Sequence, residues 1–246
     1  MAIDKNSNGF TFGFAIIMVV VVGAVLAIAA MALKGPQTEN IKKEKMKDIL
    51  AAIQVEVSMD EAPEAFSKYV KQRLVVDYNG AIVNENDGPI DPSVKSDAFN
   101  VDVKKEYKSI DDETERNYPL FVCEKDGQTY YVLPLVGKGL WGPIWGYLAL
   151  QDDYKTIYGA SFDHKTETPG LGAEIKEDFF EKQFAGEEIK ENGSFTPIMV
   201  VKGTSAPENK HAVDGITGGT ITSVGVQEML NRTLEVYNTY FSKKQG

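Results

Sequence analysis

A short stretch near the C-terminus has the residue types of an anion-binding loop. It runs from Asp214 to Ser223 and contains three glycines and four side-chain hydroxyl groups, including those of Thr217, Thr220 and Thr222. Glycine lets a backbone approach a ligand closely, and hydroxyl groups donate hydrogen bonds. A predicted helix begins where the stretch ends, and free N–H groups at a helix N-terminus favour a phosphate. The alternative is a Gly-rich turn in which Thr222 or Ser223 only caps the helix, and spacing alone favours this turn.

The composition is that of an ordinary globular protein, and it disfavours several classes of partner. The chain has 246 residues, of which 43% are hydrophobic and 25% charged, enough for one full core or two small ones. Its net charge of −10 argues against a nucleic-acid partner, which would require a basic surface. Cys123 is the single cysteine, and His164 and His211 are the only histidines. We therefore predict no disulfide, no cysteine-based or histidine-rich metal site, and no metal.

The N-terminal region contains one segment that is long and apolar enough to cross a membrane. No residue between positions 10 and 33 is charged, and as a helix this run is about 36 Å long, against about 30 Å for a hydrocarbon core. A cleaved signal peptide is the alternative, with Ala27-Ile28-Ala29 as a small-residue cleavage site. The run is too long for an ordinary signal peptide, and Asp4 beside Lys5 leaves no net positive charge before it. We favour an uncleaved anchor.

Charge near this anchor predicts an orientation. Five lysines lie between positions 34 and 47, whereas only Lys5 precedes the span, so the positive-inside rule places the C-terminal body in the cytoplasm. After the span, apolar residues recur at helical spacing from Met46 to Ile53. The predicted segments are a tail (1–9), a transmembrane helix (10–33), a juxtamembrane helix (34–60) and a soluble domain (61–246).

The body has the pattern of an α+β fold. Asp126-Gly127 separates two β-rich runs and predicts a hairpin. The run 198–201 predicts a buried strand, and apolar residues from Ile175 to Phe184 predict a helix. We expect one mainly antiparallel sheet with flanking helices, preceded by the transmembrane helix.

Two groups of residues in the body have open interpretations. Trp141 and Trp145 lie in a Gly-rich segment and either pack in the core or form the wall of an aromatic ligand site; composition favours the core. His164, Glu167 and Glu174 surround a Pro-Gly turn. For such charged loop residues the expected place is a solvated loop edge.

Three separate segments resemble parts of one known family. Asp214-x-x-Thr217-Gly218-Gly219-Thr220 resembles the flavinylation motif Asp-x-x-Ser/Thr-Gly-Ala-Thr, with Gly219 in place of the usual Ala. The others are Gly139-Leu140-Trp141-Gly142, followed by Gly146-x-Leu148-Ala149-Leu150, and Glu167-Thr168-Pro169-Gly170-Leu171-Gly172. With the single anchor, the set resembles the C subunit of the sodium-translocating NADH:quinone oxidoreductase. The related G subunit of the Rnf complex, which joins ferredoxin and NAD, matches the Trp141 segment less well.

The resemblance implies a covalent flavin on this chain. In the family, FMN is joined through its phosphate to the last threonine of the motif, which here is Thr220. A separate flavin transferase makes this bond, and Asp214 would poise the loop or serve recognition by the transferase. Thr217, Thr222 and nearby backbone N–H groups would bind the phosphate, with Lys202 as a cation nearby. Gly218 and Gly219 of the motif belong to the same cofactor-binding set. The residues that would shape the isoalloxazine pocket are Leu140, Trp141, Thr168, Gly170, Leu171 and Gly172.

The same resemblance implies an electron-transfer protein without a catalytic residue of its own. The implied partners are the flavin-bearing B subunit, the iron–sulfur-bearing membrane subunits of the complex and the flavin transferase. The family places its soluble domain on the periplasmic side of the bacterial inner membrane, which opposes the lysine count above. The rival class is a membrane-anchored binding or assembly module whose Gly-rich loop is only a turn.

Overall fold

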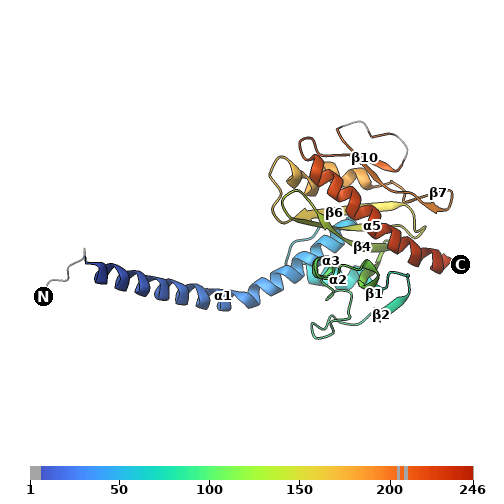
Figure 1. The fold of residues 1–246 in the computed structure, drawn as a ribbon. Coiled ribbons are helices and arrows are strands. Elements are labelled where there is room, and N and C mark those ends of the chain that lie inside the picture. Colours follow the sequence, from blue (N-terminus) through green and yellow to red (C-terminus); the bar gives the residue numbers. More distant parts are fainter. Residues whose placement is uncertain (1–6, 204–205, 208–209, 246) are drawn as a thin grey trace. The chain divides into compact units, whose positions relative to one another are not determined.

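The computed structural model describes residues 7–203, 206–207 and 210–245. The chain forms two compact units, Met1–Lys45 and Met46–Gly246, and each is described by itself. The helices are α1 (Asn8–Ala52), α2 (Ala62–Tyr69), α3 (Val103–Ser109), η1 (Glu113–Glu115), η2 (Gly172–Lys176), α4 (Asp178–Glu181), η3 (Lys182–Phe184) and α5 (Thr220–Gln245), where η denotes a 3-10 helix (Figure 1). The strands are β1 (Val70–Val76), β2 (Ile82–Asn86), β3 (Tyr118–Lys125), β4 (Gln128–Lys138), β5 (Pro143–Leu150), β6 (Ile157–His164), β7 (Lys190–Glu191), β8 (Ser194–Phe195), β9 (Met199–Val201) and β10 (Ala212–Asp214).

Helix α1 is a single continuous helix that includes Pro36. Within the described residues it is the one helix long and apolar enough to cross a membrane, which is compatible with a single-pass anchor. The predicted juxtamembrane helix over 34–60 is wrong at its end, because α1 stops at Ala52. Gln54 adopts a φ of 56°, and its N–H donates to the carbonyl of Ala51 at 2.8 Å. This left-handed residue ends the helix and turns the chain.

The second unit is built on a six-stranded sheet in the order β2-β1-β3-β4-β5-β6, with every neighbouring pair antiparallel. The predicted hairpin at Asp126-Gly127 is confirmed and joins β3 to β4. Both turn residues have positive φ, 53° and 78°, as a two-residue type I′ turn requires. The predicted α+β fold with a mainly antiparallel sheet is confirmed.

The alternation of side chains along the strands gives the sheet two cores. In β4, Tyr131, Leu133 and Leu135 face a core that includes α5, while Tyr130 and Val132 face a second core that includes the end of α1 and α2. Successive strand residues point to opposite faces, so one continuous apolar strand can serve both cores. Figure 1 shows α5 (red) running across the strands of the sheet.

The predicted helix over 175–184 is wrong, because this segment folds into three short pieces, η2, α4 and η3. Glu177 is extended, with φ −88° and ψ 146°, and interrupts it. Phe180 and Phe184 are buried against Phe162, at ring-centroid distances of 5.8 and 5.1 Å, whereas Phe179 is 59% exposed. Packing of these rings under β6 overrides the helical pattern.

Burial of Glu181, on α4, predicts a pH-dependent stability. Removal from water raises the pKa of this carboxyl group to about 7 from 4.5, and nearby acidic groups, Asp178 first, add to the rise. The backbone N–H of Phe162, 2.5 Å from its Oε1, acts against the rise. The folded state therefore binds this proton more tightly than the unfolded state, and stability is lost as the pH increases from about 4.5 to 7. We expect the melting temperature to fall across this window, and to fall less in Glu181→Gln.

The comparison is made by thermal unfolding of both proteins at several pH values between 5 and 7.5. Glu188 does not interfere, since hydrogen bonds from Lys155 and Lys210 lower its pKa to about 2, below the window. Equal pH slopes for the two proteins would contradict the prediction.

Candidate functional site

The Gly-rich stretch leads from β10 into the first turn of α5. Thr220 is the first residue of α5, and the side chains of Thr217 and Thr220 are exposed. The N–H of Ser223 donates to the carbonyl of Gly219 at 2.9 Å, so the three preceding N–H groups of the helix have no intrahelical acceptor. The expected cap at Thr222 or Ser223 is wrong, because the helix begins earlier. The Ser223 hydroxyl instead accepts from the N–H of Ile216 at 2.9 Å.

The start of this loop is held by contacts of Asp214 with two other segments. Its Oδ1 accepts from the N–H of Ala206 at 2.8 Å, and its own N–H donates to Oε1 of Gln183 at 2.8 Å. Asp214 pairs with Val201 in the parallel pair β9–β10, and the N–H of Gly215 donates to the carbonyl of Val201 at 2.7 Å. Lys202 directly follows Val201, the last residue of β9, and is exposed.

The carboxylate of Glu167 joins all three segments of the family resemblance. One oxygen, Oε1, accepts from the N–H of Trp141 at 2.8 Å, and the other, Oε2, accepts from the hydroxyl of Thr222 at 2.7 Å. Glu167 is only 5% exposed, so the expectation of a solvated loop edge is wrong for this residue. The two hydrogen bonds replace the water that a buried carboxylate loses. Sequence reasoning identified the segment but missed the role of this residue.

Two glycines make room for the Glu167 carboxylate. A Cβ atom at Gly139 would lie 2.6 Å from Oε1, and one at Gly172 would lie 2.5 Å from Oε2 and closer still to the Thr222 hydroxyl. Any larger residue at either position would displace the carboxylate or the hydroxyl. Close packing around Glu167 therefore explains Gly139 and Gly172.

The Thr222 hydroxyl does not point to an open phosphate site. Thr222 is 2% exposed, and its hydroxyl is committed to Glu167. The backbone N–H in the first helical turn is the group of this residue that remains for an anion. Of the two hydroxyl groups predicted to bind the phosphate, only that of Thr217 is on an exposed residue.

The segment 168–172 lies against the Gly-rich loop. A Cβ at Gly218 would lie 2.6 Å from Cδ2 of Leu171, and one at Gly219 would lie 3.2 Å from the N atom of Gly172 and 3.0 Å from Cγ2 of Ile216. An alanine at Gly219, as in the flavinylation motif, would need its neighbours to shift by only a few tenths of an ångström. Glycine and alanine are both compatible with this loop.

Exposed apolar side chains surround the loop. Leu140, Trp141, Leu171 and Ile221 are 47%, 66%, 42% and 57% exposed. The expectation that both tryptophans pack in the core is therefore wrong for Trp141. Its backbone N–H donates to Glu167, while its ring is exposed to solvent. Trp145 is half-buried, and the Lys104 ammonium lies 3.0 Å from its ring centroid. Thr168 and Gly170, also predicted for the site, are in the same segment as Leu171, and both are exposed.

Known proteins are similar to this chain in sequence and fold. A family described as the FMN-binding domain matches residues 139–235, which include the Trp141 segment, Glu167 and the start of α5. The crystal structure of the C subunit of Na(+)-translocating NADH-quinone reductase from Parabacteroides distasonis is 40% identical, with a TM-score of 0.74 over 85% of this chain and 97% of that one. That of Shewanella oneidensis NqrC, at 24% identity, has a TM-score of 0.66 over 83% and 99% of the two chains and shows the same fold.

Curated sequences extend the match to nearly the whole chain. The C subunit of the Na(+)-translocating NADH-quinone reductase from Haemophilus ducreyi is 30% identical over 91% of this chain and 88% of that protein. The corresponding protein from Yersinia pestis is 29% identical over 94% and 91%. The fold and the matched residues 139–235 are those of an FMN-binding domain. The chain belongs to the NqrC family, that of the C subunit of the Na(+)-translocating NADH-quinone reductase.

Proposed function

We propose that this chain is the subunit of a sodium-translocating NADH:quinone reductase that carries FMN in phosphodiester linkage to Thr220. The observation that carries the proposal is the position of Thr220, exposed at the first residue of α5 and next to the segment that contains Leu171. Free N–H groups of a first helical turn and the exposed Thr217 hydroxyl suit the phosphate. The exposed side chains of Leu140, Trp141 and Leu171 suit an aromatic ring system.

The covalent bond requires an activated phosphate, because a threonine hydroxyl is a weak nucleophile. A flavin transferase with a divalent metal supplies the activation and uses FAD as the donor. The Thr220 Oγ–phosphorus bond forms, the phosphoanhydride bond of FAD breaks, AMP leaves and the hydroxyl proton is released. Asp214 holds the loop in place for this reaction through its bonds to Ala206 and Gln183.

The residues of this chain then position the group rather than react with it. FMN, when bound, supplies electron transfer, and that chemistry is the cofactor's own. The loop and helix start fix the phosphate, Lys202 provides a cation near Asp214, and the exposed apolar side chains shield one region of the ring from water. Glu167 keeps the Trp141 segment and the start of α5 together.

The proposed setting is the bacterial inner membrane. The anchor lies within residues 10–33, and residues 61–246 form the FMN-binding domain on the periplasmic side. The electron-transfer partners are the flavin-bearing B subunit and the iron–sulfur-bearing membrane subunits. In this setting the covalent tether prevents loss of FMN.

The intact mass of the protein, expressed with and without a flavin transferase, tests the proposal. We expect the mass to increase by one FMN residue only with the transferase, and peptide mapping to assign the increase to the peptide with Thr220. The transferase is first shown to be active on a known substrate. An unmodified mass under these conditions would contradict the proposal and would favour a binding or assembly module.

A further inference from the structure

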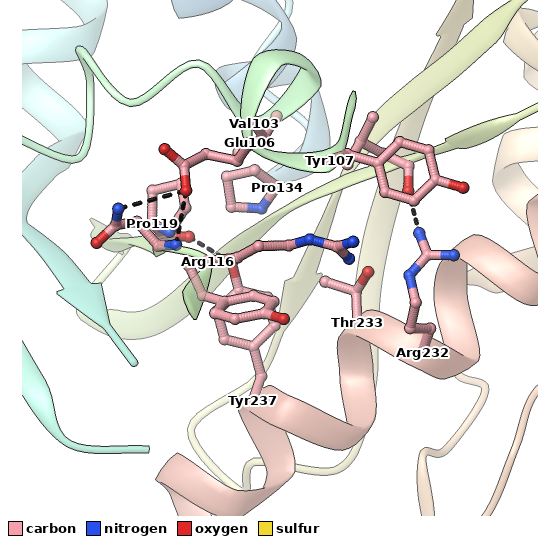
Figure 2. Close-up of a pocket in the computed structure, with 12 residues that line it drawn as sticks. Val103, Glu106, Tyr107, Arg116, Pro119, Pro134, Arg232, Thr233 and Tyr237 are labelled. Carbon is pink, nitrogen blue, oxygen red and sulfur yellow. Dashed lines mark hydrogen bonds between the residues drawn. The ribbon is translucent and has the colours of Figure 1, made fainter. Parts of the chain in front are cut away.

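The chain contains 26 lysines and arginines, yet only three of them are arginines: Arg73, Arg116 and Arg232. Arg73 is buried and paired with Asp97, with Nη2 and Oδ2 2.8 Å apart. The other two arginines are distant in sequence but line the same pocket (Figure 2). Arginine differs from lysine in its planar set of five N–H donors, which suits bidentate binding of an oxyanion. Two arginines that line one pocket of a lysine-rich chain therefore indicate a site for an oxyanion.

Both guanidinium groups lie close to the ring of Tyr107, on α3. The Cζ atoms of Arg232 and Arg116 lie 4.6 and 5.3 Å from its centroid. Tyr118 lines the same pocket: burial raises the pKa of its hydroxyl group, Arg116 acts against the rise, Glu113 adds to it, and Arg232 also acts against it. Cation–π contacts hold both side chains in place, so the positive charges are ordered before any ligand binds.

Most N–H donors of this arginine pair remain available. Arg116 donates from Nε to the carbonyl of Ile110 at 2.9 Å and from Nη2 to that of Asp111 at 3.3 Å, and Arg232 donates from Nη2 to that of Val136 at 2.5 Å. These acceptors are neutral carbonyls. Among the described residues, neither arginine has a carboxylate within salt-bridge distance.

Glu106, the carboxylate among the residues that line the pocket, accepts hydrogen bonds from Asn117 and not from the arginines. Oε2 of Glu106 accepts from the N–H of Asn117 at 3.0 Å and from its Nδ2 at 3.3 Å, and Figure 2 shows these bonds on the side of the pocket away from Arg232. The buried Thr233 adds a hydroxyl group to the wall near the arginines. The cavity is about 30 Å³, which suits one small group and is far too small for a flavin ring.

We propose that Arg116 and Arg232 form a binding site for a single phosphate group, supplied by inorganic phosphate or by a phosphomonoester. Two fixed cations balance the charge of a phosphate dianion, and their remaining N–H groups can donate hydrogen bonds to its oxygens. This site is separate from the loop at Thr220, because Arg232 lies twelve residues further along α5, about 18 Å in a helix. The proposal does not depend on flavin attachment.

Phosphate titration of the full-length protein in detergent tests the site, with melting temperature and ³¹P NMR line width as readouts. We expect a saturable rise of about 3 °C and saturable broadening with inorganic phosphate, beyond the effect of chloride at equal ionic strength. Glycerol 3-phosphate distinguishes the sources: equal or tighter binding indicates a phosphomonoester, and weaker binding indicates free phosphate.

Three variants separate the site from general electrostatics. Arg116→Gln and Arg232→Gln are expected to weaken phosphate binding at least tenfold, and Arg116→Lys to weaken it despite keeping the charge. Lys108→Gln, which removes an exposed charge next to Tyr107, is the matched control and should bind as the wild type does. The wild-type titration decides even if a variant fails to fold: an effect no larger than that of chloride would overturn the proposal. So would binding that persists in the double Arg→Gln variant.

Discussion

A Thr220→Val variant is expected to fold normally and to carry no flavin after denaturation. Thr220 is exposed at the first residue of α5, so the stability change should stay within about 0.5 kcal/mol. The hydroxyl that would bond to phosphorus is absent, so covalent attachment should be abolished completely. Quinone reductase activity of the assembled complex should be lost with it. Flavin fluorescence after denaturing electrophoresis measures the attachment, and circular dichroism measures the fold.

Two neighbouring variants make this result specific. Thr220→Ser keeps a hydroxyl and is expected to retain the flavin, whereas Thr217→Val removes an exposed hydroxyl from the same loop and should keep the mass increase at a lower rate of attachment. A fluorescent band from Thr220→Val would refute the assignment. Loss of the band from Thr217→Val alone would move the attachment point to Thr217.

A Glu167→Gln variant is expected to be destabilised by about 2 kcal/mol, because an amide cannot accept hydrogen bonds at both oxygen positions. One of the two donors, the Trp141 N–H or the Thr222 hydroxyl, then faces an NH₂ group in a buried place. In the flavin-loaded protein the variant also lacks one buried negative charge beneath the loop. The reduction potential should therefore rise, since the additional electron is repelled less.

Chemical unfolding and a redox titration measure the two effects of Glu167→Gln. Glu174→Gln is the control, because Glu174 is half-buried and accepts from the N–H of Gly170 at 2.8 Å in the same segment. A purely structural role for Glu167 would change stability and leave the potential unaltered. Unchanged stability would contradict the bridging role itself.

Local patterns predicted much of the fold. The Asp126-Gly127 turn and the apolar runs on either side of it specify a hairpin through backbone geometry alone. The helix expected over 175–184 failed, because Phe180 and Phe184 are placed by their contacts with Phe162 on β6. Such a tertiary contact outweighs a short helical pattern. The end of α1 was also missed, since Gln54 is not a residue type that announces a left-handed turn.

The candidate site was predictable in its parts but not in its assembly. Sequence pattern identified the Gly-rich stretch as a loop before a helix, and a family resemblance singled out Thr220. Neither could show that Glu167 is buried, because a charged residue beside a Pro-Gly turn is normally solvated. Its partners come from the turn before β5 and from α5. Trp141 was also misplaced, because composition favours the core for a tryptophan, whereas its ring is exposed.

The hydrogen bonds of Glu167 also bear on whether folding or flavin attachment comes first. Its carboxylate connects Trp141, 26 residues before it, with Thr222, 55 residues after it. Contacts between such distant positions form only after the intervening chain has closed into its native topology. A newly made chain therefore presents Thr220 on a loose segment, without its neighbouring loops. If the proposed function holds, flavin attachment comes after folding. The fraction of molecules that carry flavin then measures the fraction that has folded.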